Sequence, residues 1–115
     1  MRNNPRRLKI GYKKYVLKFV KKIDDNDGQG ECTTIWWSNH DHPTGTIRIK
    51  KGQAGVEKAN TILHEIGHAI IASQSPKISD KLEEHIVNSF TNGLVAFIKD
   101  NPKFFSQVVD LINNG

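Results

Sequence analysis

Two histidines separated by three residues stand in the middle of the chain, in the segment His64-Glu65-Ile66-Gly67-His68. On a helix, residues four apart lie one turn apart on the same side, so both imidazoles point in one direction. Two imidazoles placed in this way suit two ligand positions of a tetrahedral Zn²⁺ site. The segment therefore predicts that His64 and His68 bind zinc.

The carboxyl group of Glu65 has a different place in this geometry. It lies about 100° round the helix from His64, beside the ligand axis rather than on it. A carboxylate there can take a proton from a zinc-activated water molecule as the water attacks a carbonyl, and can then give that proton to the leaving amine. We therefore expect Glu65 to act as general base and then as general acid.

The surrounding residues predict the helix that this geometry needs. Apolar side chains recur at intervals of three and four residues over residues 53–73, and Ser75-Pro76 ends the pattern. We expect this apolar stripe to face the core, with His64 and His68 on the nearly opposite side. The stripe consists of Val56, Ala59, Leu63, Ile66 and Ile70. Gly67 inside the helix suggests close packing of a neighbouring backbone.

A catalytic zinc site needs a third protein ligand and keeps one position open. The candidates are Glu83, Glu84 and His85, at the start of a second predicted helix. Glu83 lies midway across the apolar face of this helix, which favours it as the third ligand. However, the segment Asp80–Glu83 also has the pattern of a capping box, in which Glu83 would bond to the backbone of Asp80. Glu84 lies at the edge of the apolar face, and His85 is expected at the surface. The residue pattern alone leaves Glu83 and Glu84 open.

The run Ile62–Ile70, followed by Glu84-His85-Ile86-Val87-Asn88-Ser89-Phe90, resembles the ImmA/IrrE family of small metallopeptidases, in particular its short phage and prophage members. In that family and in thermolysin-like gluzincins, the ligand Glu is followed by Asn or Asp four residues later and by Phe six residues later. The resemblance implies that Glu84 is the third ligand, with Glu83 as the alternative. It also implies that Asn88 orients a ligand imidazole.

This resemblance covers about residues 30–100 and extends to a hairpin before the active-site helix. It implies a minimal zincin-like fold and zinc-dependent hydrolysis of peptide bonds. The expected substrate is a regulatory protein such as a repressor, in the cytoplasm of a bacterium or a phage-infected cell. The short gap between His68 and Glu84 leaves little room for the loops that shape a substrate cleft in larger relatives.

The remaining elements are strands followed by helices, which predicts an α+β fold with a small antiparallel sheet and three helices. Residues 12–23 fit a strand or a helix, and their aromatic and β-branched content favours a strand. Cys32–Trp37 and Thr46–Lys50 are expected to form a hairpin. Thr46–Lys50 suits either a strand that pairs with substrate or an ordinary edge strand that Arg48 and Lys50 guard. Asn101 and Pro102 open a third helix with an apolar side.

Composition limits the class of protein. The 115 residues predict a single domain, and residues 1–10 are expected to form a flexible basic arm. No apolar run approaches the ~18 residues of a membrane span. The single cysteine, Cys32, excludes an internal disulfide and is expected to be a small buried side chain. The absence of an export signal favours a cytoplasmic protein.

The charge is the basis of one competing interpretation. Seventeen basic residues stand against twelve acidic ones, giving a net charge of +5. A solvated basic face is the ordinary reading, and a basic phage protein that binds nucleic acid is an alternative. A second alternative is a non-catalytic binding protein that zinc stabilises. His40-Asp41-His42 and the pair Trp36-Trp37 are weaker candidates for ligand or substrate contacts, and Asp24–Gly28 is expected to be a turn.

Overall fold

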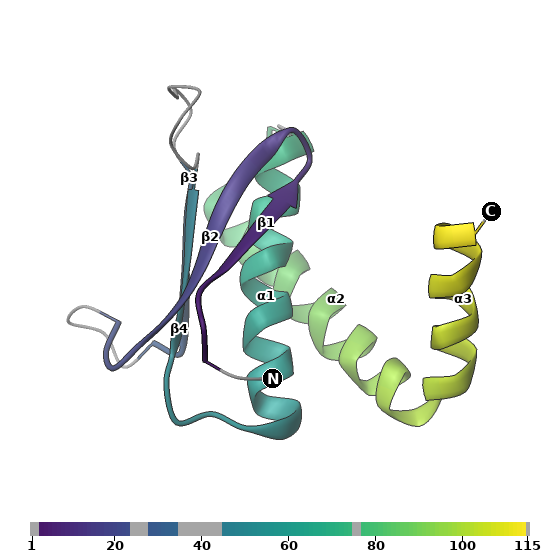
Figure 1. Cartoon of the computed structure of the whole chain (residues 1–115). Helices are drawn as coiled ribbons and strands as arrows, with labels where there is room; N and C mark the ends of the chain where they lie inside the picture. The colour runs from purple at the N-terminus through teal and green to yellow at the C-terminus, as the bar shows by residue number, and fades with distance from the viewer. Residues whose placement is uncertain (1–2, 24–27, 35–44, 75–76, 115) are drawn as a thin grey trace.

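The computed structural model describes residues 3–23, 28–34, 45–74 and 77–114. Over these residues four strands precede three helices, which confirms the predicted α+β order (Figure 1). The strands are β1 (Arg6–Ile10), β2 (Lys13–Val20), β3 (Gly30–Thr34) and β4 (Gly45–Lys50), and the helices are α1 (Gly55–Gln74), α2 (Asp80–Asp100) and α3 (Pro102–Asn114). The strand interpretation of residues 12–23 is confirmed by β2.

The four strands form one sheet in the order β1-β2-β4-β3. The β1–β2 and β3–β4 pairs are antiparallel, as expected, but β2 and β4 are parallel, so the sheet is mixed rather than wholly antiparallel. The hairpin of β3 and β4 folds back so that β4 takes the central position. Its Ile47 and Ile49 are fully buried there, and this burial favours the central place for β4.

The predicted roles of Thr46–Lys50 as an edge strand are therefore wrong. β4 has a neighbour on each side, and Arg48 makes an ion pair with Glu31 of β3, at 2.6 Å between Nη2 and Oε1. The edge strand beside β4 is β3, which also packs against α1. A segment that paired with the sheet near α1 would consequently meet β3.

The expected flexible arm over residues 1–10 is also wrong for residues 6–10. These residues form β1, which pairs with β2 in a register that runs from Arg6↔Leu17 to Ile10↔Lys13. Ile10 is buried in the core, so burial as well as backbone hydrogen bonding holds this segment. The basic residues of β1 are thus part of the sheet rather than of a tail.

At one end of the sheet, the side chain of Tyr15 in β2 reaches across β4 to β3. In the register, Gly45 of β4 lies opposite Tyr15 of β2 on one side and opposite Thr34 of β3 on the other. The Tyr15 hydroxyl reaches Thr34 Oγ1 at 2.7 Å. A Cβ atom on residue 45 would overlap the Tyr15 ring, so the missing side chain of Gly45 makes room for this contact.

The main core lies between one face of the sheet and α1. Its buried residues are Ile10, Tyr15, Leu17, Phe19, Ile47, Ile49 and Ala69. The predicted core stripe of α1 is only partly right, because Val56 and Ile70 are each 48% exposed. Of the stripe, Ile66 does pack on the core, together with Ile62, which the prediction did not include, and Glu65 and Ala69 are the buried residues of this helix. The buried side of α1 differs from the predicted stripe because the helix packs against two neighbours, the sheet and α2.

Helices α2 and α3 pack less closely. α2 buries Val87, Thr91 and Val95, whereas α3 buries no residue. The sequence predicts an apolar face of the second helix made of Leu82, Ile86, Val87, Phe90, Leu94, Phe97 and Ile98. This prediction is wrong in part, since four of these residues stay exposed: Leu82, Ile86, Phe90 and Phe97. The start of α3 at Asn101 and Pro102 is confirmed, with Phe105 N donating to Asn101 O at 3.0 Å.

Figure 1 shows α3 extending away from the sheet and α1, joined to them through α2. Within the described ranges, no helix combines the length and the apolar character needed to cross a membrane. His40-Asp41-His42, Trp36-Trp37 and Asp24–Asp27 lie outside the described residues, so the interpretations made for them stay predictions.

Candidate metal site

His64 and His68 lie on the same side of α1, as their spacing predicts. Their ring centroids are 5.0 Å apart and the planes meet at 70°. Glu84, from the first turns of α2, completes a group in which one ligand atom of each residue lies within 4.8 Å of the others. The structure therefore brings together the three residues that were predicted to bind zinc.

The carboxylate of Glu84 lies between the two imidazoles. Its Oε1 is 2.9 Å from His64 Nε2, and its Oε2 is 2.8 Å from His68 Nε2. Two imidazole nitrogens and a carboxylate are donors that Zn²⁺ accepts, and three protein ligands are the number found in catalytic zinc sites. The donor set and its convergence fit a divalent metal ion.

Glu83 has a separate place behind His68. Its Oε2 lies 2.6 Å from His68 Nδ1, on the side of the ring away from Glu84. Because a carboxylate only accepts, Nδ1 carries the proton of this hydrogen bond, and Nε2 is the nitrogen that faces the group of ligands. Such a contact fixes the orientation of a ligand imidazole.

The predicted capping box is wrong, which explains why the Glu83 side chain is available for this contact. The N-cap of α2 is Ser79, whose Oγ accepts from Leu82 N at 3.1 Å. The helix thus begins one residue before the position that the capping box assumes. Glu83 points toward α1 instead of folding back to the backbone of Asp80.

The role that the resemblance implies for Asn88 finds no counterpart in the described part of the chain. Asn88 is exposed there, and no hydrogen bond joins it to either imidazole. The contact with a ligand imidazole that was expected of Asn88 is made by Glu83. The sequence offers one signal for this result, since Glu83 and Glu84 are adjacent and one helix can direct neighbouring side chains to different sides of a ring.

Glu65 is buried between α1 and β3, with 7% of its surface exposed. A Cβ atom on Gly30 would come within 2.9 Å of Glu65 Cγ and Oε2, so the backbone of β3 lies directly over the carboxyl group. Burial raises the pKa of Glu65 to about 7; His68 opposes this shift, and the negative charges of Glu84 and Glu31 add to it. The carboxyl group therefore exchanges its proton near neutral pH.

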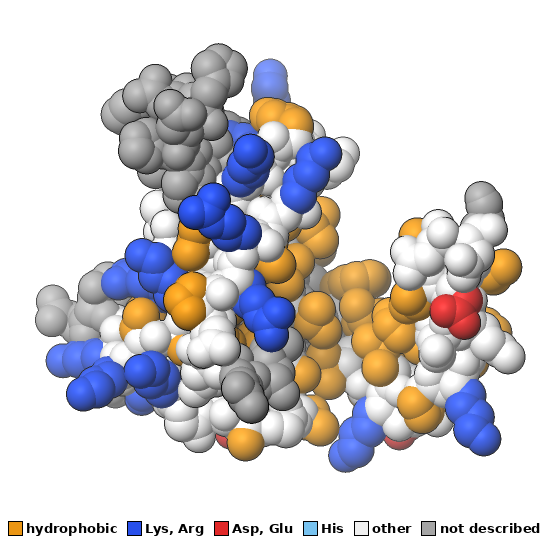
Figure 2. Space-filling view, in the orientation of Figure 1, with side chains coloured by type: hydrophobic (Ala, Val, Ile, Leu, Met, Phe, Trp, Pro, Cys, Tyr) orange, Lys and Arg blue, Asp and Glu red, His pale blue; other side chains and the backbone are white. Residues whose placement is uncertain are grey.

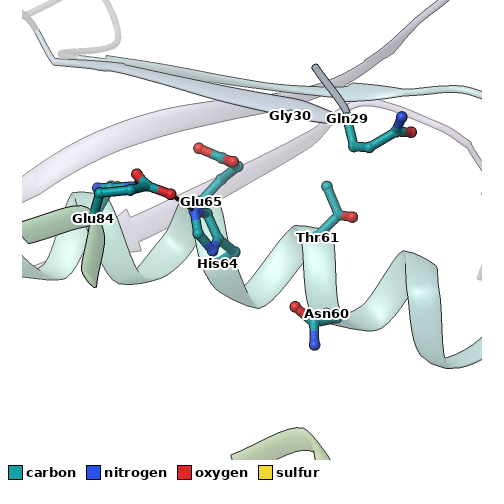
Figure 3. Close-up of a pocket in the computed structure, with 8 residues that line it drawn as sticks. Gln29, Gly30, Asn60, Thr61, His64, Glu65 and Glu84 are labelled. Atoms are coloured by element: carbon teal, nitrogen blue, oxygen red, sulfur yellow. Dashed lines mark ion pairs between the residues drawn. The ribbon is translucent and has the colours of Figure 1, made fainter. Parts of the chain in front are cut away.

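Two cavities meet at Glu65 and His68. One, of about 340 Å³, is lined by Gln29, Gly30, Asn60, Thr61, His64, Glu65, His68 and Glu84. The other, of about 280 Å³, is lined by Cys32, Thr34, Glu65, His68, Ala72 and Glu83. Figure 3 shows Asn60 and Thr61 on the same helix as His64, with Gln29 and Gly30 on the opposite wall. The site is a trough between α1 and the edge strand β3.

Sequence reasoning did not assign the residues of this trough. Asn60 and Thr61 could have been found, because they precede His64 by four and three residues and so share its side of the helix. Gln29 and Gly30 could not, because their place depends on how β3 packs against α1. Cys32 is half-buried rather than buried, and burial together with the charge of Glu65 raises its pKa to about 12.

Two smaller predictions concern the helices themselves. His85 is exposed, as expected. A Cβ on Gly67 would lie 3.1 Å from Val87 Cγ1, so Gly67 does mark close packing, although the neighbour is a side chain of α2 rather than a backbone. The close approach of the two helices at Gly67 lets Glu84 reach the histidines.

Comparisons with known proteins identify no relative. No family model matches the chain, and no curated protein or solved structure shows significant similarity to it.

Proposed function

We propose that this protein is a zinc-dependent metallopeptidase. The observation that carries the proposal is the convergence of His64, His68 and Glu84 in a solvent-open trough, with the buried carboxyl group of Glu65 beside them. The resemblance to ImmA/IrrE-like peptidases, drawn from the same residues, agrees with it.

His64, His68 and Glu84 would hold the metal, and Glu83 would keep the His68 ring in place. A Zn²⁺ ion in such a site polarises the scissile carbonyl and makes water acidic enough to attack near neutral pH. Three protein ligands converge among the described residues. Three ligands leave room for this chemistry, whereas structural zinc sites are closed by four.

Glu65 would move the proton. Burial raises the pKa of this carboxyl group, which suits it to accept a proton from the attacking water and to release it to the leaving amine. The backbone of β3 over the carboxyl group limits its contact with bulk water, and the trough leaves it open on the side of the histidines. Both properties suit a general base that then acts as an acid.

Strand β3 would position the substrate. It is an edge of the sheet and forms the wall of the trough opposite α1, so an extended peptide could pair with its backbone beside Glu65. We propose an intracellular regulatory protein as the natural substrate, as the resemblance implies.

Metal content and cleavage, measured together, test the proposal. The parent protein, purified with zinc present, is expected to hold one Zn²⁺ per chain by elemental analysis and to cleave members of a mixed peptide library followed by mass spectrometry. His68→Ala should lose both properties. His85→Ala is the matched control, because His85 is an exposed histidine next to Glu84, and it should keep both.

Glu65→Gln separates catalysis from binding. The variant should fold and hold zinc but show no cleavage, because an amide cannot accept the proton. Cleavage at the parent rate by Glu65→Gln would overturn the mechanism. Stoichiometric zinc without cleavage in the parent would favour a zinc-stabilised binding protein, and salt-dependent DNA binding without zinc would favour a nucleic-acid-binding protein.

A further inference from the structure

Helix α3 has no place in the proposed chemistry and no buried residue. It is 13 residues long, and helices of about this length are marginal in water unless an apolar face packs against a partner. Its apolar residues occur at helical spacing and include Phe104, Val109, Leu111 and Ile112. The last two are 72% and 77% exposed, so α3 lacks the packing that such a helix needs.

Helix α2 carries a matching exposed stripe. While Val87, Thr91 and Val95 face α1, a second set of apolar side chains lies on another side of the helix: Leu82, Ile86, Phe90 and Phe97. The Phe97 ring meets the Phe104 ring edge to face, with centroids 6.3 Å apart. The stripe of α2 therefore continues into that of α3, and we call these eight exposed residues of α2 and α3 the arm face.

The arm face holds eight of the eleven large hydrophobic side chains that are exposed in the described part of the chain. Its side chains are between 37% and 77% exposed. Three of the eight are phenylalanines, which offer roughly 150–250 Å² each. With the five aliphatic side chains they leave on the order of several hundred Å² of apolar surface uncovered. A standard interface takes ~800 Å² from each partner. Figure 2 shows hydrophobic side chains on the side of α3 that is turned toward α2, and others on its outer side.

Charge decides where two copies of this chain could meet. Two chains of net charge +5 repel each other, so they associate best where charge is low. The charged side chains of α3 are Lys103 and Asp110, which cancel. Exposed basic residues occur instead on the sheet, among them Arg7, Lys9 and Lys18. An interface at the arm face keeps the basic surfaces of two copies apart.

We propose that the protein is a two-fold symmetric dimer, in which α3 of each copy packs against the α2 stripe of the other. Each chain supplies both an amphipathic helix and an apolar surface that accepts one, so a single two-fold axis satisfies both sets at once. Phe90 precedes Asn101 in the sequence by as many residues as Ile112 follows it. They are therefore expected to meet across the interface.

The first test measures mass by light scattering over a range of micromolar concentrations. The parent is expected at twice the chain mass of 13.0 kDa, and Ile112→Glu at the chain mass. Tyr12→Glu is the matched control, because Tyr12 is 74% exposed but lies in the turn between β1 and β2, and this variant should remain dimeric. A monomeric parent, or an equal effect of both variants, would overturn the proposal.

A mixing experiment tests the pairing of α2 with α3. Phe90→Glu and Ile112→Lys are each expected to be monomeric, since each puts a charge against an apolar side chain. Mixed together, they should form a heterodimer, because one of its two contacts is native and the other pairs Glu with Lys. Failure of the mixture to associate would refute this arrangement of helices.

Hydrogen exchange gives a readout that needs no variant. Amides of α3 should become at least tenfold better protected as the parent is concentrated through its association range. Amides of β2 and β4, which are remote from the arm face, should not change. Protection of α3 that is independent of concentration would contradict the proposal. None of these measurements depends on zinc or peptidase activity, so the dimer and the proposed function can fail separately.

Discussion

Helices α1 and α2 both supply the candidate metal site, but they are held in different ways. α1 packs against the sheet on one side and against α2 on the other, whereas α2 packs mainly against α1 and meets α3 only at its end. His64 and His68 thus stand on the well-packed part of the molecule, and Glu84 stands on a helix with fewer contacts. The difference implies that a bound ion would join two regions of unequal stability.

The largest effect is expected in the core between the sheet and α1. Ile47→Ala should lower the free energy of unfolding by about 2–5 kcal/mol, because Ile47 is fully buried and its loss leaves a cavity. Ile70→Ala is the matched variant on the exposed side of α1 and should cost less than about 1 kcal/mol. Urea unfolding measures both, and similar losses would show that the core is elsewhere.

Removal of the metal tests whether a bound ion stabilises α2 by connecting it to α1. Zn²⁺ at a hundredfold excess over its dissociation constant should stabilise the fold by ~2.7 kcal/mol. Chelation should therefore increase hydrogen exchange in α2 more than in β2 or β4, because α2 holds Glu84 and has less packing of its own. Equal increases in hydrogen exchange in α2 and in the two strands would argue against a difference in stability between α2 and the rest of the molecule.

Glu83→Gln tests how His68 is oriented. The amide is a weaker acceptor for His68 Nδ1, and loss of such a contact typically costs 10–100-fold in metal affinity. Asn88→Ala is the control on the same helix and should leave zinc affinity unchanged, because Asn88 is exposed. Isothermal titration with Zn²⁺ gives both values. A greater loss for Asn88→Ala would restore the role that the family resemblance implies.

Gly67→Ala should have the smallest effect of the four. Its Cβ would lie 3.1 Å from Val87 Cγ1, and a β-branched side chain in a helix has one preferred rotamer, so α2 must shift. Zinc affinity should fall by up to about tenfold, equivalent to ~1.4 kcal/mol.

Gly93→Ala is the control for this variant. Nothing lies within 4 Å of the added methyl group, so affinity should be unchanged while α2 gains up to ~1 kcal/mol of helix stability. Unchanged zinc affinity in Gly67→Ala would show that the helix spacing does not control the position of Glu84.

Local patterns in the sequence predicted those features that depend on a single element. The four-residue spacing of His64 and His68 fixed their common side of α1, and Asn101-Pro102 marked the start of α3. Tertiary packing decided the rest. The position of β4 depends on how a hairpin folds back, and the separate places of Glu83 and Glu84 depend on the distance between two helices.

The contact of Tyr15 with Thr34 across Gly45 has a consequence for how this sequence can change. A larger residue at position 45 would displace the ring and release the end of β3, the strand that covers Glu65. Substitution at position 15, 34 or 45 is therefore constrained by the residues at the other two positions. Among descendants of this chain, tyrosine, glycine and threonine should be inherited as a set or lost together.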